Sequence, residues 1–256
     1  ERYVNSIFKK FRMTDAKPVK TPAVNGNSQE KSTVKINYPF REAVGSLLHL
    51  STKTRADIAQ AVGMISRRME NFVQADVIAL KRIFRYLAGT RARGIRFSTN
   101  GDLNILNAFS DSDYAGDEEN RRSTTGYVMI FGGGPITWCS RRQPIVTLSS
   151  TEAEYVAAAD TCKVVSYLKT LIEELLGKKI RTRLNIDNQS SINLIKTGVI
   201  NKRSKHIDVR YHYIHEKYVN DDIEIIYCPT EFQRADIFTK PLDKIKFEEH
   251  CKYLLV

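Results

Sequence analysis

The sequence contains few residues that would tie the chain together covalently. Its cysteines are scattered and form no C-x-x-C pair, so neither a disulfide framework nor a cysteine-ligated zinc site is indicated. His206, His212 and His215 lie in or beside one predicted helix, but without a cysteine at ligand spacing they do not favour zinc. We expect buried thiols in a reducing compartment at Cys139, Cys162, Cys228 and Cys251.

Long apolar runs are also missing. No stretch of 18 apolar residues occurs, so we expect no membrane span. The first residues, "ERYVNSIFKKF", lack the apolar region of a signal peptide, and no initiator Met precedes them, so we expect a piece of a longer polypeptide. With 256 residues and 42% hydrophobic content, the chain is large enough for one large domain or two ordinary ones.

Acidic residues are scarce in one part of the chain only. Residues 1–99 hold 19 Lys and Arg against 7 Asp and Glu, whereas residues 100–256 hold 21 against 22. A basic part beside a neutral part suggests that one region holds a polyanion and the other acts on it, which predicts a nucleic-acid partner. Solubility alone is the alternative explanation of the charge.

The basic part is expected to be helical. Helices are predicted over residues 1–13, 54–69 and 75–90, and a loop or linker over residues 15–39. Lys81 and Arg85 lie four residues apart and therefore share one helix face. That face is suited to a phosphate backbone, and a solvated basic face is the alternative.

The pattern changes from helix to strand near residue 94. Strands are predicted over 94–99, 103–111, 123–132, 135–140, 181–187 and 223–229, and helices over 149–177, 188–198, 206–220 and 234–242. Hairpin-linked strands followed by alternating helices and strands predict an α/β fold, with a mixed sheet and helices on its faces.

Four carboxylates occupy the ends of these elements. Asp111 and Asp187 end two strands, Glu154 lies in the first turn of the long helix, and Asp236 begins the last helix. Sites in open α/β sheets gather at strand ends, so these acids converge if the two strands are neighbours. Clustered anions repel one another unless a cation lies between them. Two divalent ions about 3.5–4 Å apart would relieve the repulsion and clamp a phosphodiester during attack by water.

Each acid also has a purely structural interpretation. Asp111 could begin a turn, Asp187 could cap the next helix, and Asp236 could favour a helix N-terminus through the macrodipole. Glu154 follows Thr151 by three residues and could close a capping box.

A second capping pair lies in the same turn. Ser149 and Glu152 have the same spacing, and we interpret Glu152 as the capping glutamate at the more exposed start of the helix.

Long motifs give the chain a family resemblance. The stretches "FSDSDYAGDEENRRSTTGYVMIFGGGPITWCSRRQPIVTLSSTEAEYVA", "NIDNQSSI", "KHIDVRYHYIHE" and "FQRADIFTKPL" resemble the ribonuclease H domain of copia-type retrotransposon Pol polyproteins. Upstream, "YPFREAVGSLLHLSTKTRADIAQAVGMISRRM" and "KRIFRYLAGT" resemble the segment that joins reverse transcriptase to ribonuclease H, and "YVNSIFKKFRMTDAKPVKTP" resembles the polymerase thumb region. The resemblance covers essentially the whole chain.

The resemblance implies a fold, an activity and a cofactor. The fold is a ribonuclease H-like mixed five-stranded sheet with flanking helices, preceded by a small basic helical region. The activity is metal-dependent cleavage of the RNA strand of RNA–DNA hybrids during reverse transcription, with two Mg²⁺ or Mn²⁺ ions. The family's metal-binding acids fall on Asp111, Glu154, Asp187 and Asp236. Asp113, two residues beyond Asp111 on the same strand face, is the alternative first ligand.

The resemblance also predicts domains and partners. The expected domains are a thumb-like end of reverse transcriptase with linker (1–40), a helical connection region (41–99), the ribonuclease H domain (100–243) and a C-terminal tail (244–256). The partners are the hybrid and the rest of the polyprotein, in the cytoplasm or virus-like particles, with import into the nucleus as a further step. The Tyr-x-Asp-Asp signature of the polymerase is absent from the sequence.

A basic loop before one helix is a second candidate contact with phosphate. It carries Lys202, Arg203, Lys205 and His206. Ribonucleases H often have a histidine in the loop before the last acid, but "CPTEFQRAD" contains none.

Two other functions remain open. A decayed or domesticated copy would bind nucleic acid without cleaving it, and departures from the family pattern, such as Ala56 in place of proline, are consistent with that. An integrase on the same fold would use three acids, which fits the segment before Asp236 poorly.

Overall fold

The chain divides into two compact units. The computed structural model describes residues 1–24, 36–98, 100–117, 119–198 and 208–255, with side chains of 208–211 excepted. One unit combines residues 1–96 with 241–256, and the other spans residues 97–240. The last segment, expected to be a tail, is therefore grouped with the N-terminal residues.

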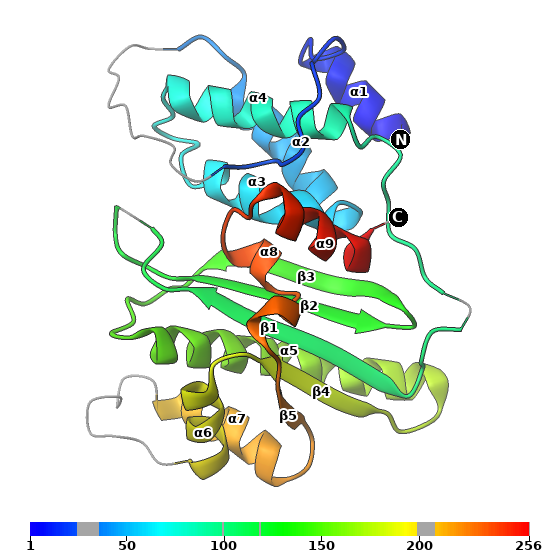
Figure 1. The fold of residues 1–256 in the computed structure, drawn as a ribbon, viewed down its shortest axis with the longest axis vertical. Coiled ribbons are helices and arrows are strands. Elements are labelled where there is room, and N and C mark those ends of the chain that lie inside the picture. The colour runs from blue at the N-terminus through cyan, green and yellow to red at the C-terminus, as the bar shows by residue number, and fades with distance from the viewer. Residues whose placement is uncertain (25–35, 99, 118, 199–207, 256) are drawn as a thin grey trace. The chain divides into compact units, whose positions relative to one another are not determined.

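The first unit is helical (Figure 1). Its helices are α1 (Arg2–Lys10), α2 (Phe40–Lys53), the 3₁₀ turn η1 (Ala56–Ile58), α3 (Ala59–Ser66), α4 (Gln74–Ala88) and α9 (Lys244–Leu254). Helix α2 was not predicted separately, although Phe40, Val44 and Leu47 are buried at helical spacing. The described part of the predicted loop 15–39 contains neither a helix nor a strand.

Helix α9 shows why the expected tail is not free. The Asp243 side chain caps it by accepting hydrogen bonds from the backbone N–H groups of Ile245 and Lys246. Phe247 and Leu254 on one face are buried. A capped helix with a buried apolar face is stabilised by packing, so this segment is part of the first unit.

The second unit contains a mixed five-stranded sheet. Its strands are β1 (Ile105–Asp113), β2 (Thr124–Phe131), β3 (Gly134–Arg142), β4 (Arg181–Ile186) and β5 (Glu224–Tyr227). Their order is β3-β2-β1-β4-β5; β1 pairs antiparallel with β2 and parallel with β4. The prediction of a mixed five-stranded sheet with flanking helices is confirmed.

The strand predicted over residues 94–99 was wrong. Residues 94–98 form no strand, and Ser98 donates one backbone hydrogen bond to Gly132. Phe97 has a relative exposure of 55%. The alternating pattern lacked a buried face to hold it in a sheet.

Helices cover both faces of the sheet. They are α5 (Ser150–Leu176), α6 (Gln189–Thr197), α7 (Asp208–Val219), the 3₁₀ turn η3 (Thr230–Phe232) and α8 (Asp236–Thr239). On β1, Ser110 is hydrogen-bonded to Thr161 of α5, whereas the next residue, Asp111, is hydrogen-bonded to Thr239 of α8. Because side chains alternate along a strand, α5 and α8 contact opposite faces.

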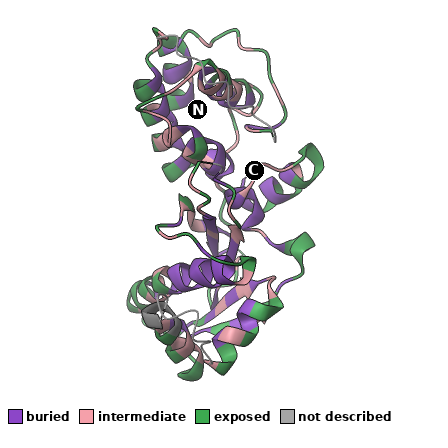
Figure 2. Ribbon diagram, turned by 90° about the vertical axis from the view of Figure 1, so that its left-hand side faces the viewer, coloured by how far each residue is buried: buried purple, intermediate pink, exposed green. Residues whose placement is uncertain are grey.

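The core of the second unit lies between α5 and the sheet. Leu106, Ala108 and Leu184 of the strands pack with Val156 and Val165 of α5, all fully buried, and buried residues run through both kinds of element (Figure 2). This packing holds α5 against the sheet. No helix within the described residues has the length and apolar character needed to cross a membrane.

Candidate functional site

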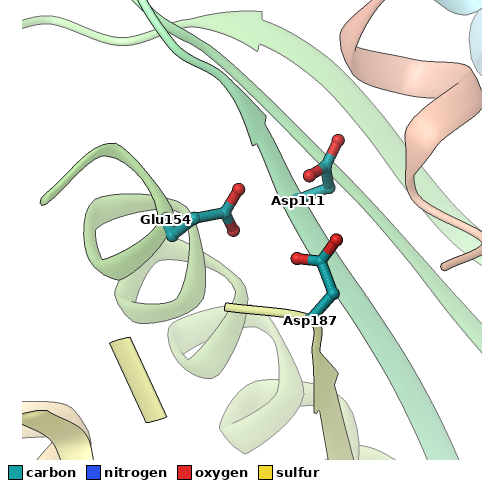
Figure 3. A group of neighbouring side chains, drawn as sticks. All are labelled: Asp111, Glu154 and Asp187. Atoms are coloured by element: carbon teal, nitrogen blue, oxygen red, sulfur yellow. The ribbon is translucent and has the colours of Figure 1, made fainter. Parts of the chain in front are cut away.

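Three carboxylates meet where two parallel strands end. Phe109 of β1 lies opposite Asn185 of β4, so the same register carried two residues further brings Asp187 level with Asp111. Glu154 reaches the same place from the first turns of α5 (Figure 3). One oxygen from each of these three side chains lies within 4.8 Å of the other two. The structure therefore brings together three of the four predicted acids in one group.

Glu154 is oriented by β1 and not by a helix cap. Its Oε1 accepts hydrogen bonds from the backbone N–H of Ser112, at 3.0 Å, and from the Ser112 hydroxyl, at 3.2 Å. The side chain therefore points at the strand end next to Asp111. The capping interpretation of Glu154 was wrong.

Ser149 caps α5, and the Glu152 side chain supports the same turn. The Ser149 hydroxyl accepts from the Glu152 N–H at 3.2 Å, and Glu152 Oε2 accepts from the Leu148 N–H at 2.7 Å. Ser149 caps the helix as predicted, but Glu152 accepts from the Leu148 N–H and not from the Ser149 N–H that a capping box uses, and the expected difference in exposure is not found. Glu152 is 8% exposed and Glu154 is 6% exposed. Their hydrogen-bond partners, and not their burial, therefore distinguish their roles.

The fourth acid lies beside Asp111, outside that group of three. Asp236 begins α8 and is 3% exposed. Thr239, at the other end of α8, donates its hydroxyl to Asp111 Oδ2 and to the backbone oxygen of Asp236. Lys240 Nζ lies 3.2 Å from Asp236 Oδ2 and 4.0 Å from Asp111 Oδ2. One short helical turn thus links the first and fourth acids.

A glycine in β2 lets α8 approach the sheet. A Cβ atom on Gly126, which lies opposite Asp111, would be 2.5 Å from Thr239 Cγ2 and 2.9 Å from Phe238 Cβ. Glycine within a strand often marks such a close approach. Just before α8 in the chain, the buried Gln233 donates from Nε2 to the Ser110 carbonyl oxygen and accepts from the Ala235 N–H.

Asp113 is directed elsewhere. A Cβ atom on Gly116 would lie 1.9 Å from Asp113 Oδ2, so this carboxylate is turned toward the loop after β1. Among the described residues, the group of close carboxylates contains Asp111 and not Asp113. The geometry favours Asp111 as the first ligand.

Several known proteins similar to this chain are transposon Pol polyproteins. No protein-family model matches the chain. It is 40% identical over 264 residues to the retrovirus-related Pol polyprotein from transposon TNT 1-94 of Nicotiana tabacum. That match covers 100% of this chain and 20% of the polyprotein. It is 38% identical over 251 residues to the Pol polyprotein from transposon RE1 of Arabidopsis thaliana, with 96% and 17% covered. The chain belongs to the family of copia-type retrotransposon Pol polyproteins. It spans about a fifth of the length of these relatives.

Solved structures similar to this Pol polyprotein segment are ribonucleases H. LC11-RNase H1, isolated from compost by a metagenomic approach, has a TM-score of 0.40 and 17% identity, over 54% of this chain and 94% of that one. RNase H1 from Halobacterium salinarum NRC-1 has a TM-score of 0.37 and 18% identity, over 53% and 94%.

Burial and mutual repulsion raise the pKa values of three acids in this Pol polyprotein segment. Burial, followed by the charges of Asp111 and Asp187, raises the pKa of Glu154 well above its ordinary value. Burial and then Asp111 raise the pKa of Asp187 and bring that of Asp236 from 3.8 to about 7, although Lys240 opposes the shift in both. The protein concentrates negative charge here at a cost in stability.

The donor set fits divalent cations. Every donor is a carboxylate oxygen, which Mg²⁺ and Mn²⁺ prefer. Glu154 Oε2 and Asp236 Oδ1 are buried and have no hydrogen-bond partner among the described residues. Buried polar atoms are ordinarily satisfied, and metal ions would satisfy these two.

The raised pKa values predict a pH-dependent stability in the absence of divalent ions. The folded state holds the Asp236 proton more tightly than the unfolded chain does, so this stabilisation is fully present below pH 3.8 and is lost as the pH rises through about 7. In EDTA, the free energy of unfolding should fall by roughly 2–3 kcal/mol more for the wild type than for Asp236→Asn between about pH 5 and about pH 8. Urea unfolding at both pH values measures this difference. If the free energy of unfolding falls equally with pH in the two proteins, Asp236 does not hold the extra proton.

Only Lys81 and Arg85, of the residues predicted to contact phosphate, lie in the part of the chain that the structure describes. Lys81 and Arg85 are both exposed, four residues apart on α4. Arg85 Nε donates to the Lys17 carbonyl oxygen at 2.9 Å, and Lys81 Nζ lies 5.6 Å from the centre of the Tyr38 ring. Lys202, Arg203, Lys205 and His206 lie outside the described residues.

Several residues around the acids were missed by sequence reasoning. They are Ser112, Thr230, Gln233, Thr239 and Lys240. Thr230 donates its hydroxyl to Asp187 Oδ2 at 3.0 Å, from the loop that lacks the expected histidine. The one available signal was the position of Thr239 and Lys240, three and four residues after Asp236, which is one helical turn.

Proposed function

We propose that this chain is a metal-dependent endoribonuclease that cleaves the RNA strand of RNA–DNA hybrids during retrotransposon reverse transcription. The observation that carries the proposal is the convergence of Asp111, Glu154 and Asp187 at the ends of two neighbouring parallel strands, with Asp236 beside them. Membership of the Pol polyprotein family supports it, because a polymerase that copies RNA into DNA needs the template removed afterwards.

The four acids would hold two divalent ions, Mg²⁺ or Mn²⁺. Two ions bound between carboxylates activate a water molecule and stabilise the charge that develops on the phosphodiester. The chain's own contribution is placement: Ser112 orients Glu154, Thr230 orients Asp187, and Thr239 orients Asp111. A ligand held in one rotamer needs no reordering when the substrate arrives.

The basic first part would hold the hybrid. Residues 1–99 carry 19 basic and 7 acidic residues, and Lys81 is exposed on α4. Lysine and arginine side chains that neutralise phosphates release counterions, so hybrid binding should weaken steeply with salt. The rest of the polyprotein, including its reverse transcriptase portion, is the proposed protein partner.

The test is cleavage of a hybrid labelled on its RNA strand by the whole chain. Mg²⁺ or Mn²⁺ should support cleavage, EDTA should abolish it, and Asp187→Asn should be inactive. Asp187→Asn should remain folded, because it removes a repelled charge without opening a cavity. Cleavage by Asp187→Asn at the wild-type rate would contradict the ligand assignment.

The cleavage assay combined with a gel-shift assay distinguishes the alternative of a decayed or domesticated copy. Such a protein would bind the hybrid in a gel-shift assay and leave its RNA strand intact at every metal concentration. Binding with cleavage supports the nuclease, and binding without it supports the alternative.

A further inference from the structure

We propose that Lys240 is a built-in counter-cation of the carboxylate site: its ammonium group takes part of the place of a divalent ion between Asp111 and Asp236, and it moves out when that ion binds. Lys240 would thereby set how tightly the site holds metal. The inference rests on the proposed function, because it assumes that these acids bind divalent ions.

The backbone places Lys240 firmly at the site. It directly follows α8 and precedes Pro241, which restricts it to an extended conformation; its φ and ψ are −141° and 155°. Helix α8 is in turn fixed by the Thr239 hydroxyl, which donates to Asp111 and to the backbone of Asp236. The first atoms of the Lys240 side chain therefore start from a defined position beside two acids.

The ammonium group contacts oxygens that a metal ion would also need. Nζ lies 3.2 Å from Asp236 Oδ2 and 4.0 Å from Asp111 Oδ2, whereas Asp236 Oδ1 has no hydrogen-bond partner among the described residues. A divalent ion is a smaller and more highly charged cation that prefers carboxylate oxygens. Lysine and metal therefore compete for the negative charge of the same two carboxylates.

Lys240 also has a way out. Its side chain is 40% exposed, whereas those of Asp111 and Asp236 are 4% and 5% exposed. A lysine ammonium is carried on a flexible four-carbon stem and is strongly hydrated, so it can swing into water while the acids stay in place. A buried arginine held by several hydrogen bonds would not offer this mobility.

Calorimetric titration of the whole chain with Mn²⁺ alone tests the competition. It is performed at about pH 8.5, well above the ordinary pKa of a carboxyl group, so that protons compete less for the carboxylates. Lys240→Met should bind Mn²⁺ roughly fivefold more tightly than the wild type, since one partly exposed ion pair no longer competes. Lys240→Arg, which keeps the charge, should stay within about twofold of the wild type.

The control is Lys217→Met, which removes the same charge from an ion pair with Asp222, 2.9 Å long and outside the acid cluster. It should leave Mn²⁺ binding unchanged. If Lys240→Met does not fold, as judged by circular dichroism, Lys240→Gln decides in its place. Mn²⁺ binding by the Lys240 variant that is equal to or weaker than wild-type binding would overturn the proposal, because it would make Lys240 a support for the acids and not a competitor.

Failure of the proposed function gives a different result. In that case the wild type neither binds Mn²⁺ nor cleaves the hybrid, and both ideas fall together. If the wild type binds and cleaves but the Lys240 variants bind Mn²⁺ as it does, only the role of Lys240 is rejected.

Discussion

Replacing Glu154 with glutamine should lower the rate of hybrid cleavage by about 100-fold or more, whereas Glu152→Gln should leave it nearly unchanged. Metal ions contribute several kcal/mol of charge stabilisation in the transition state, and each factor of ten in rate corresponds to about 1.4 kcal/mol. Glu154 lies among the proposed metal ligands, and Glu152 lies two residues, or about 200°, around the same helix.

The two variants form a matched pair. Both remove one negative charge from the first turns of α5, and both residues are buried. In Glu154→Gln, the amide side chain would keep an oxygen that can accept from the Ser112 N–H, and removing a repelled charge should leave thermal unfolding unchanged or raise its midpoint. Glu152→Gln should cost at most about 1 kcal/mol of stability through a weaker cap and dipole interaction.

Cleavage rates and thermal unfolding, measured for both variants, separate the roles. A Glu152→Gln protein that is folded but inactive, together with an active Glu154→Gln protein, would mean that the other face of α5 supplies the metal ligand. An equal loss of cleavage rate in both variants would mean that cleavage depends on the start of α5 as a whole and not on one carboxylate.

The sequence contained enough information for the elements that have one strong local pattern. The long helix ending at Gly177 was predictable because its stop residue adopts the left-handed conformation, with φ of 63°, that glycine favours. The convergence of Asp111 and Asp187 followed once β1 and β4 were assumed to be neighbours. By contrast, apolar and polar residues alternate over residues 94–98 as they do in a strand, but neither face of this segment is buried.

What could not be predicted depends on contacts between distant segments. Glu152 and Glu154 have the same residue type and similar burial, and only their partners, Leu148 and Ser112, tell them apart. In the sequence, Lys240 is marked only by its spacing of four residues from Asp236 within the predicted helix over 234–242. Its role becomes visible because the Gly126 position lets α8 lie close to β2.

The second large effect is expected on stability, at a buried ion pair of the first unit. Asp57→Asn should lower the free energy of unfolding of that unit by about 3–5 kcal/mol, because it leaves the Arg55 guanidinium buried without a counter-charge. Arg55 and Asp57 side chains are 1% and 0% exposed and are joined by two hydrogen bonds of 3.0 and 2.7 Å. Tyr86 also donates its hydroxyl to Asp57, and Arg55 donates to Thr90.

Glu42→Gln is the control, since it makes the same change from carboxylate to amide in the same unit. Glu42 pairs with Lys10 at 2.8 Å, but the two side chains are 55% and 51% exposed, so the loss should stay below about 1 kcal/mol. Urea unfolding of both variants, followed by far-ultraviolet circular dichroism, measures the two losses against the wild type. A double variant, Arg55→Met with Asp57→Asn, should recover part of the loss because no buried charge is then left unpaired. If Asp57→Asn cost no more than Glu42→Gln, the buried guanidinium would have to find water or another acceptor, and the pair would not be what holds Arg55 inside the first unit.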